Sequence, residues 1–165
     1  MTQNHVFRAA SVVFCAAVLW PGIGPAGEKK ITREVVPAAV LSAFEKSYPE
    51  ATIRGFSREE EGGKTLYEVE SLEGKTTRDI QYAPDGTVAE IEEGVAVNDL
   101  PAVVREAVKR EYPKGKVVKA EKVTRESMVE YEVHLTAGKA RHELVLDAAG
   151  KVVEKDDVRK EDVKK

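Results

Sequence analysis

Apolar residues recur at intervals of three and four in two stretches of the chain, a spacing that predicts two amphipathic helices. Each stretch is followed by proline, and because proline disfavours helical geometry in the residue before it, both helices should end at a tyrosine. Asp99 stands where an N-cap residue would begin the second helix. The stripe consists of Val36, Val40, Ala43, Phe44 and Tyr48 in the first stretch and of Leu100, Val103, Val104, Ala107, Val108 and Tyr112 in the second.

After each predicted helix come four short segments with the composition of strands, separated by turn residues. In the first set the turns are Gly62-Gly63, Glu73-Gly74 and Pro84-Asp85-Gly86. The second set repeats two of these turns, but it has lost the glycines near Thr124 to Ser127 and is expected to turn differently there. The pattern predicts an α+β fold of two tandem repeats, each one helix followed by a four-stranded antiparallel meander sheet. The helix covers the apolar face, and a linker from Glu92 to Asn98 joins the repeats.

The two sets are copies of one unit, as a comparison of the sequence with itself at an offset of 64 residues indicates. Positions 36–91 then give 14 identities over 56 aligned positions, far above the roughly 6% expected from average composition. The identities include Tyr48-Pro49 with Tyr112-Pro113, Tyr67-Glu68-Val69 with Tyr131-Glu132-Val133, and Gly74-Lys75 with Gly138-Lys139. We place the first repeat at residues 32–95 and the second at 96–158.

A two-residue loop fixes which side chains lie opposite each other across a hairpin. With loops placed at Glu73-Gly74 and Ala137-Gly138, Tyr131 should lie opposite Leu144, and the apolar residues of each hairpin fall on one face. The first repeat gives the same pattern, which supports the assignment of strands.

The polar face of the same hairpins collects acidic residues. The predicted register sets Glu68 opposite Asp79 and Glu132 opposite Glu143, with His134 on the same face. Like charges directly opposed are destabilising unless something neutralises them. Neighbouring lysines and arginines would make this a solvated face. Otherwise, these five residues form an interaction surface for a basic partner or a divalent cation.

Composition and motifs argue against an enzyme. The chain has 26 basic and 29 acidic side chains, so it lacks the positive charge of a nucleic-acid binder. His134 and His142 should point to opposite sides of one hairpin and therefore do not share a metal. The serines lie outside any G-x-S-x-G turn, and phosphate-binding glycine motifs are missing from the sequence. We therefore predict no catalytic residues, no cofactor and no catalytic metal set.

The first 26 residues have the features of a secretory signal peptide. Arg8 precedes an apolar run that ends at Trp20, and small residues suit cleavage after Ala26. A buried N-terminal helix is the alternative, but the sequence becomes highly charged from Glu28 onward. Phe14 before Cys15 does not suit lipidation, and the apolar run is too short to span a membrane. After cleavage we expect a periplasmic or secreted protein that contains no cysteine. It should end in a charged segment from Asp156 that includes a tail at residues 159–165.

The order of these motifs resembles the PepSY-like family, which is related in fold to the β-lactamase inhibitor protein. The resemblance covers nearly all of residues 36–158. It is carried by Leu100-Pro101-Ala102-Val103, Tyr112-Pro113, Tyr131-Glu132-Val133, Gly138-Lys139 and Gly150-Lys151-Val152, with their counterparts in the first repeat. It implies an exported bacterial protein whose sheet offers a concave surface to another protein.

The resemblance favours a non-enzymatic binding module of the periplasm, with a peptidase, hydrolase or other envelope protein as its partner. The motifs that match belong to the fold, so no inhibitor residues can be carried over from the family. A poor supply of aromatic residues after position 26 disfavours a tight inhibitory interface. The alternative is an envelope ligand or divalent-cation sensor that uses the acidic face, and a scaffold without a ligand also stays open. The sequence indicates no oligomeric state.

Overall fold

The computed structural model describes residues 28–61 and 63–158, and it has the predicted α+β class. The predicted signal peptide at 1–26 and the tail at 159–165 lie outside these residues. The helices are α1 (Ala38–Ser47) and α2 (Ala102–Glu111), each preceded by a short 3-10 turn, η1 (Arg33–Val35) and η2 (Val97–Asp99). The strands are β1 (Lys29–Lys30), β2 (Thr52–Glu61), β3 (Lys64–Glu73), β4 (Thr76–Tyr82), β5 (Val88–Gly94), β6 (Lys116–Arg125), β7 (Met128–Ala137), β8 (Ala140–Asp147) and β9 (Val152–Val158).

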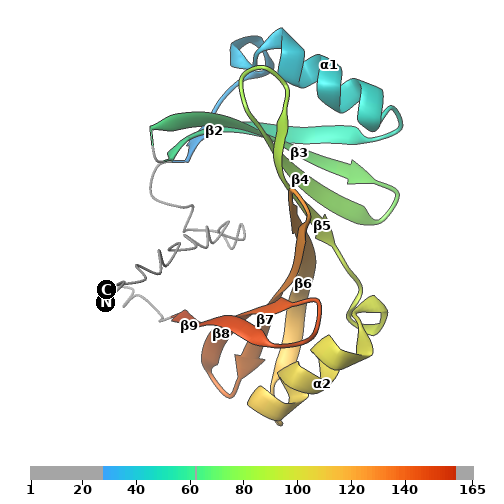
Figure 1. The fold of residues 1–165 in the computed structure, drawn as a ribbon, viewed down its shortest axis with the longest axis vertical. Coiled ribbons are helices and arrows are strands. Elements are labelled where there is room, and N and C mark those ends of the chain that lie inside the picture. The colour runs from blue at the N-terminus through green and yellow to red at the C-terminus, as the bar shows by residue number, and fades with distance from the viewer. Residues whose placement is uncertain (1–27, 62, 159–165) are drawn as a thin grey trace, which may run out of the picture.

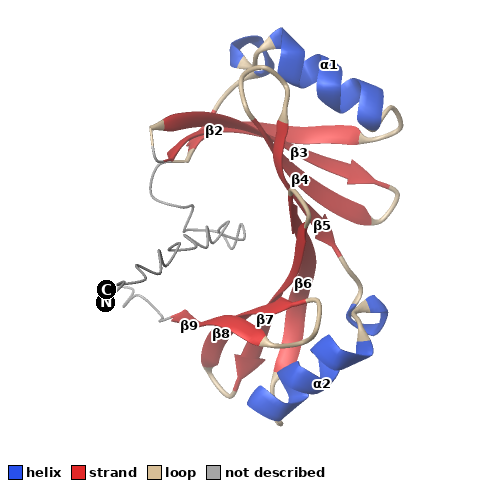
Figure 2. Ribbon diagram, viewed as in Figure 1, coloured by secondary structure: helices blue, strands red, loops and turns tan. Residues whose placement is uncertain are grey.

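The nine strands of the described residues form one antiparallel sheet in the order of the sequence. Figure 1 shows that this sheet curves strongly, with both helices on its convex side and a concave face opposite them. Figure 2 shows the same division, with the blue helices outside the curve of red strands. The concave face is therefore the broad surface of the sheet that neither helix covers.

The structural elements recur at the spacing of the sequence repeat. Helices α1 and α2 begin 64 residues apart, and so do each of the strands β2 to β5 and their counterparts β6 to β9. Strand β1 has a counterpart too, since Lys30 pairs with Ser57 as Gly94, at the end of β5, pairs with Glu121. Strand β5 thus closes the first half of the sheet and begins the second.

This shared strand corrects the predicted organisation. The two halves do not form separate four-stranded sheets, because β5 pairs with β6 from Ile91 to Gly94 and joins them. The predicted linker beginning at Glu92 is therefore partly strand, and Glu92 pairs with Val123. We call the β5–β6 pairing the seam. The charged segment from Asp156 is also strand at its start, because Asp156 pairs with Glu143 in β8.

The helix ends follow the prediction at the C-terminus but not at the N-terminus. Tyr48 and Tyr112 are the C-cap residues, and their N–H groups donate to the carbonyls of Phe44 and Val108. Asp99 does not cap α2, because it belongs to η2 and proline occupies the N-cap position. The predicted cap residue thus lies two residues before the actual N-cap, Pro101.

The hairpin loops are Gly74-Lys75 and Gly138-Lys139, one residue later than predicted. A positive φ at each glycine, and not at the lysine after it, fits the type II′ turns that favour right-handed strand twist. The shift moves every cross-strand partner by two residues, so Tyr131 lies opposite Leu146 rather than Leu144. Since side chains alternate with period two, the faces stay as predicted while the partners change.

Each half has its own apolar core between its helix and the convex face of the sheet. The first contains Val36, Val40, Phe44, Phe56, Val69, Ile80 and Tyr82, and the second contains Leu100, Val104, Ala107, Val108, Ala120, Val133, Leu135, Leu144 and Leu146. Gly86 and Gly150 let the turn after β4 and β8 approach the helix backbone. A Cβ at these positions would lie 2.7 Å from Ala39 O and 2.6 Å from Val103 O. None of the helices in the described ranges is long and apolar enough to cross a membrane.

Candidate functional site

The concave face of the sheet carries a row of acidic side chains because each strand alternates core and polar residues. Val69, Ile80 and Val133 point to the cores, so their neighbours in sequence point the other way. We call the resulting set the acidic face. It consists of Glu68 and Glu70 in β3, Asp79 in β4, Glu90 and Glu92 in β5, Glu121 in β6, Glu132 and His134 in β7, and Glu143 in β8.

All five residues of the predicted interaction surface lie on this face, but not as the predicted opposing pairs. Glu68 lies opposite Gln81 in the register, and Asp79 lies opposite Glu70 on one side and Glu92 on the other. The reason is the one-residue shift of the hairpin loop, which moves every cross-strand partner by two residues. Asp79 is therefore the residue in the first half that lies opposite like charges, Glu70 on one side and Glu92 on the other.

The three predicted residues of the second half lie in direct contact. His134 Nε2 lies 2.7 Å from Glu132 Oε1, and its Nδ1 lies 3.7 Å from Glu143 Oε2. In the register His134 lies opposite Glu143, while Glu132 lies opposite Val145. The imidazole thus separates two carboxylates. His142 points to the convex side, as predicted, where its ring lies 4.5 Å from that of Tyr112.

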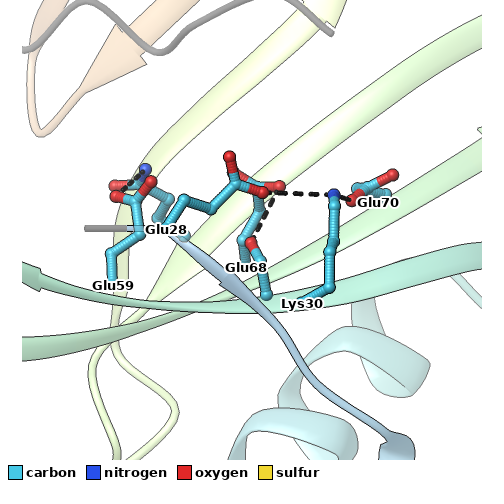
Figure 3. Close-up of polar contacts among 7 residues, drawn as sticks. Glu28, Lys30, Glu59, Glu68 and Glu70 are labelled. Carbon is cyan, nitrogen blue, oxygen red and sulfur yellow. Dashed lines mark hydrogen bonds and ion pairs between the residues drawn. The ribbon is translucent and has the colours of Figure 1, made fainter. Parts of the chain in front are cut away.

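In the first half, the carboxylates gather around a lysine (Figure 3). Lys30 Nζ lies 3.1 Å from Glu28 Oε1 and also contacts Glu70 Oε1. Ser57 Oγ donates to Glu68 Oε1 at 3.3 Å. We call Glu28, Glu68 and Glu70, together with Lys30, the lysine-filled cluster. Carboxylate oxygens of its three acids lie within 4.8 Å of one another.

A second group of carboxylates converges at the seam, where fewer of them are paired with a cation than in the lysine-filled cluster. Asp79, Glu92 and Glu121 each offer an oxygen, and these oxygens lie within 4.8 Å of one another. We call these three residues the seam cluster. Lys119 Nζ lies 2.7 Å from Glu121 Oε1 and is the cation paired with the cluster among the described residues. Glu121 also lies within 4.8 Å of ligand atoms of Glu132 and His134, so the seam cluster continues into the second half.

Three carboxylate oxygens near the seam are buried without a hydrogen-bond partner in the described part of the chain. They are Glu90 Oε1, Glu92 Oε1 and Glu121 Oε2. Arg125 contacts Glu90 through its other oxygen and lies 3.1 Å from Glu130. Buried, unpaired carboxylate oxygens are costly to folding, and protonation or a bound cation would relieve this cost.

Burial and mutual repulsion raise the pKa of several of these acids. Desolvation, followed by the charge of Asp79, raises the pKa of Glu68 to about 8. Desolvation, followed by the charge of Glu121, raises the pKa of Asp79 to about 6. Burial and the nearby Glu90 and Glu121 raise the pKa of Glu92 far above its usual range. These acids therefore hold their protons to a higher pH than free carboxylic acids do.

Glu90, Glu92 and Glu121 were not predicted as site residues. The signal available in the sequence is the Glu-Ile-Glu alternation at positions 90–92, which is typical of a strand with one acidic face. The offset of 64 also relates Glu28 to Glu92, outside the range in which the repeat was aligned. What the sequence does not contain is the contact of β4, β5 and β6 that brings Glu92 next to Asp79 and Glu121.

Comparison with solved structures identifies the same fold. A structure from Bacteroides eggerthii DSM 20697, described as one of "putative periplasmic proteins", has a TM-score of 0.64 at 17% identity and covers 74% of this chain and 89% of that chain. A BLIP-like protein from Bacteroides fragilis NCTC 9343 has a TM-score of 0.60 at 21% identity, covering 78% and 92%. A DUF2874 family protein from Bacteroides uniformis ATCC 8492 has a TM-score of 0.63 at 17% identity, covering 74% and 89%.

No curated protein matches the chain. A family model with the description "Putative beta-lactamase-inhibitor-like, PepSY-like" matches residues 12–88 and again residues 65–154. Two matches to one model agree with an internal repeat, and together they include most of the sequence. The chain therefore belongs to the PepSY-like, β-lactamase-inhibitor-like family, as its motifs predicted.

Proposed function

We propose that this protein is an exported, non-enzymatic binding module whose acidic face receives a basic segment of another envelope protein. The observation that carries the proposal is the excess of carboxylates on a continuous concave surface that extends from β3 to β8. The helices occupy the other side of the sheet, so neither helix covers the concave face (Figure 2). Complementary charge would speed association and exclude acidic partners.

The comparisons support an envelope location and a partner of the hydrolase class. The related structure from B. eggerthii carries the description periplasmic, and the sequence begins with a predicted signal peptide at residues 1–26. The related protein from B. fragilis is described as BLIP-like, and the family description reads "Putative beta-lactamase-inhibitor-like, PepSY-like". A peptidase or another hydrolase is accordingly the partner class we propose. The two units of one helix and four strands, at 32–95 and 96–158, would together present one binding surface.

Binding to synthetic peptides tests the role of charge. A lysine- and arginine-rich peptide should bind the purified protein, and an acidic peptide of equal length should not. At about pH 9, where Glu68 is ionised, the double variant Glu68→Gln with Glu143→Gln should weaken binding at least fivefold, because it then removes one carboxylate charge from each half of the face. Glu106→Gln, on the exposed side of α2, is the matched control. Equal affinity of both variants and the parent protein for the basic peptide would contradict the proposal.

Recovery of partners from a periplasmic extract tests the class of partner. A hydrolase retained by the parent protein and lost with the double variant would support the proposal. Each recovered hydrolase is then assayed with and without the purified protein, which separates binding from inhibition. Retention of the same proteins by the parent and the double variant would overturn the role of the acidic face.

A further inference from the structure

Equivalent carboxylates in the two halves of the sheet have different charged neighbours. In the first half, Lys30 lies between Glu28 and Glu70. The residues 64 positions later are Gly94 for Lys30 and Glu92 for Glu28. The second half has therefore kept the carboxylate and lost the ammonium group that neutralises it.

A lysine at position 94 would require the side chain of Thr77 to move. A Cβ at Gly94 would lie 2.4 Å from Thr77 Oγ1, well inside van der Waals contact. The position equivalent to Ser57 is Glu121, which adds another negative charge in place of a hydroxyl. Lys119 forms an ion pair with one oxygen of Glu121, and Asp79 and Glu92 form no ion pair with a lysine or arginine among the described residues.

Two of the three acids in the seam cluster are deeply buried. Glu121 is 2% exposed and Glu92 is 7% exposed, and each has one carboxylate oxygen without a hydrogen-bond partner among the described residues. These residues and Asp79 offer oxygens within 4.8 Å of one another. Calcium binds oxygen at about 2.3–2.6 Å, so two ligands on opposite sides of the ion lie roughly 4.6–5.2 Å apart. The separations in the seam cluster therefore fit around one calcium ion.

We propose that Asp79, Glu92 and Glu121 bind one divalent cation of the calcium class at the seam, in the role that the Lys30 ammonium group has in the first half. Three carboxylates and no nitrogen or sulfur form the donor set of a hard cation. Magnesium fits less well, because it requires shorter bonds in octahedral geometry and retains its water. The site is independent of whether a protein partner binds the acidic face.

The neighbouring group of Glu121, Glu132 and His134 is the weaker candidate for a metal. It contains a nitrogen ligand, which would favour zinc. However, His134 Nε2 already lies 2.7 Å from Glu132 Oε1, so both groups satisfy each other without an ion. Calcium bound by the seam cluster, by contrast, would link β4 and β5 to β6 and so connect the two halves of the sheet.

Calorimetric titration and thermal unfolding of the full, chelator-treated protein test the site. We expect one calcium ion per chain and a Tm rise of roughly 5–10 °C when calcium is about a hundredfold above its Kd. Magnesium should give a smaller rise, and sodium chloride at equal ionic strength should give none. Glu92→Gln and Asp79→Asn should each abolish the calcium-induced rise. Glu92→Gln should also raise the Tm of the metal-free protein, because it removes a buried repulsion.

Glu68→Gln is the matched control, because it removes a buried acid of the same face outside the seam cluster. It should keep the calcium-induced rise. A parent protein that shows no calcium-dependent change in heat or Tm up to 10 mM overturns the site. A rise that survives Glu92→Gln, or zinc binding that depends on His134 in place of calcium binding, overturns it as well.

Discussion

The first and second halves of this sheet share their architecture but differ in how charge is balanced on the concave face. Their convex sides correspond closely: Arg78 lies over the Tyr48 ring at 4.3 Å, and His142, its counterpart, lies 4.5 Å from the ring of Tyr112. On the concave side, a lysine fills the first cluster, whereas glycine stands at the equivalent place in the second. Packing positions have thus been retained where the helix covers the sheet. The charged residues differ between the two halves where no helix covers the sheet.

The largest expected effect tests the shared part of the comparison. Gly86→Ala and Gly150→Ala should each destabilise the protein by about 3 kcal/mol, because each adds a Cβ under 3 Å from a helix carbonyl at a positive φ. Chemical denaturation measures the loss. Gly138→Ala is the control, since its φ is also positive but nothing lies within 4 Å, and it should cost only about 1 kcal/mol. Equal losses at all three positions would show that the helix contact is unimportant.

The next effect is a decline of stability with rising pH, expected from Glu68. Its pKa is raised from 4.5 to about 8 by burial and by Asp79, Glu28 and Glu70, against the opposing charge of Lys30. The folded state therefore holds a proton that the unfolded state has released between these pH values. Stability should be greatest toward pH 5 and fall by about 2–4 kcal/mol as the pH rises to about 8. Denaturation in chelator-containing buffer at each pH measures the change.

Glu68→Gln isolates this contribution. The variant should lose a large part of the decline between pH 5 and pH 8, whereas Glu106→Gln, exposed on α2, should keep it. Stability that is constant or increases over this interval in the parent protein would show that Glu68 is not held protonated.

The smallest expected effect sharpens the difference between the halves. Lys30→Ala should destabilise the metal-free protein by about 1 kcal/mol, because this lysine is half exposed and solvent weakens its ion pairs. It should also raise the calcium stoichiometry from one to two per chain, since Glu28, Glu68 and Glu70 would then lack their ammonium partner. Lys29→Ala, on the same strand, is the control. An unchanged stoichiometry in Lys30→Ala would mean that the two clusters are not equivalent.

The sequence predicted those parts of the fold that depend on local periodicity. The helices, the repeat and the side of the sheet on which each residue lies all follow from spacing along the chain, and Tyr48 and Tyr112 end their helices as expected. Cross-strand partners were wrong by two residues, because period-two alternation is unchanged by such a shift. Only the turn geometry at Gly74 and Gly138 distinguishes the two registers.

The candidate site was predictable only in part, for the same reason. Glu68 and Glu132 belong to long alternating strands, so their face could be inferred. Glu92 was assigned to a linker, because its strand continues into the second half and its burial comes from β4 and β6. Contacts of that kind depend on which strands become neighbours, and local pattern does not specify this.

The sequence order of the strands also determines how the chain can assemble. Most strand pairs are joined by tight turns, but Gly94 pairs with Glu121 across the whole of α2, and Lys30 pairs with Ser57 across α1. Closing a longer loop costs more chain entropy, so the hairpins should form before these two pairings. Separating the two halves at the seam would break only the pairing from Ile91 to Gly94 and would leave every hairpin intact. An ion bound at the seam would hold the two halves of the sheet together, and the concentration of that ion would determine how often the halves separate.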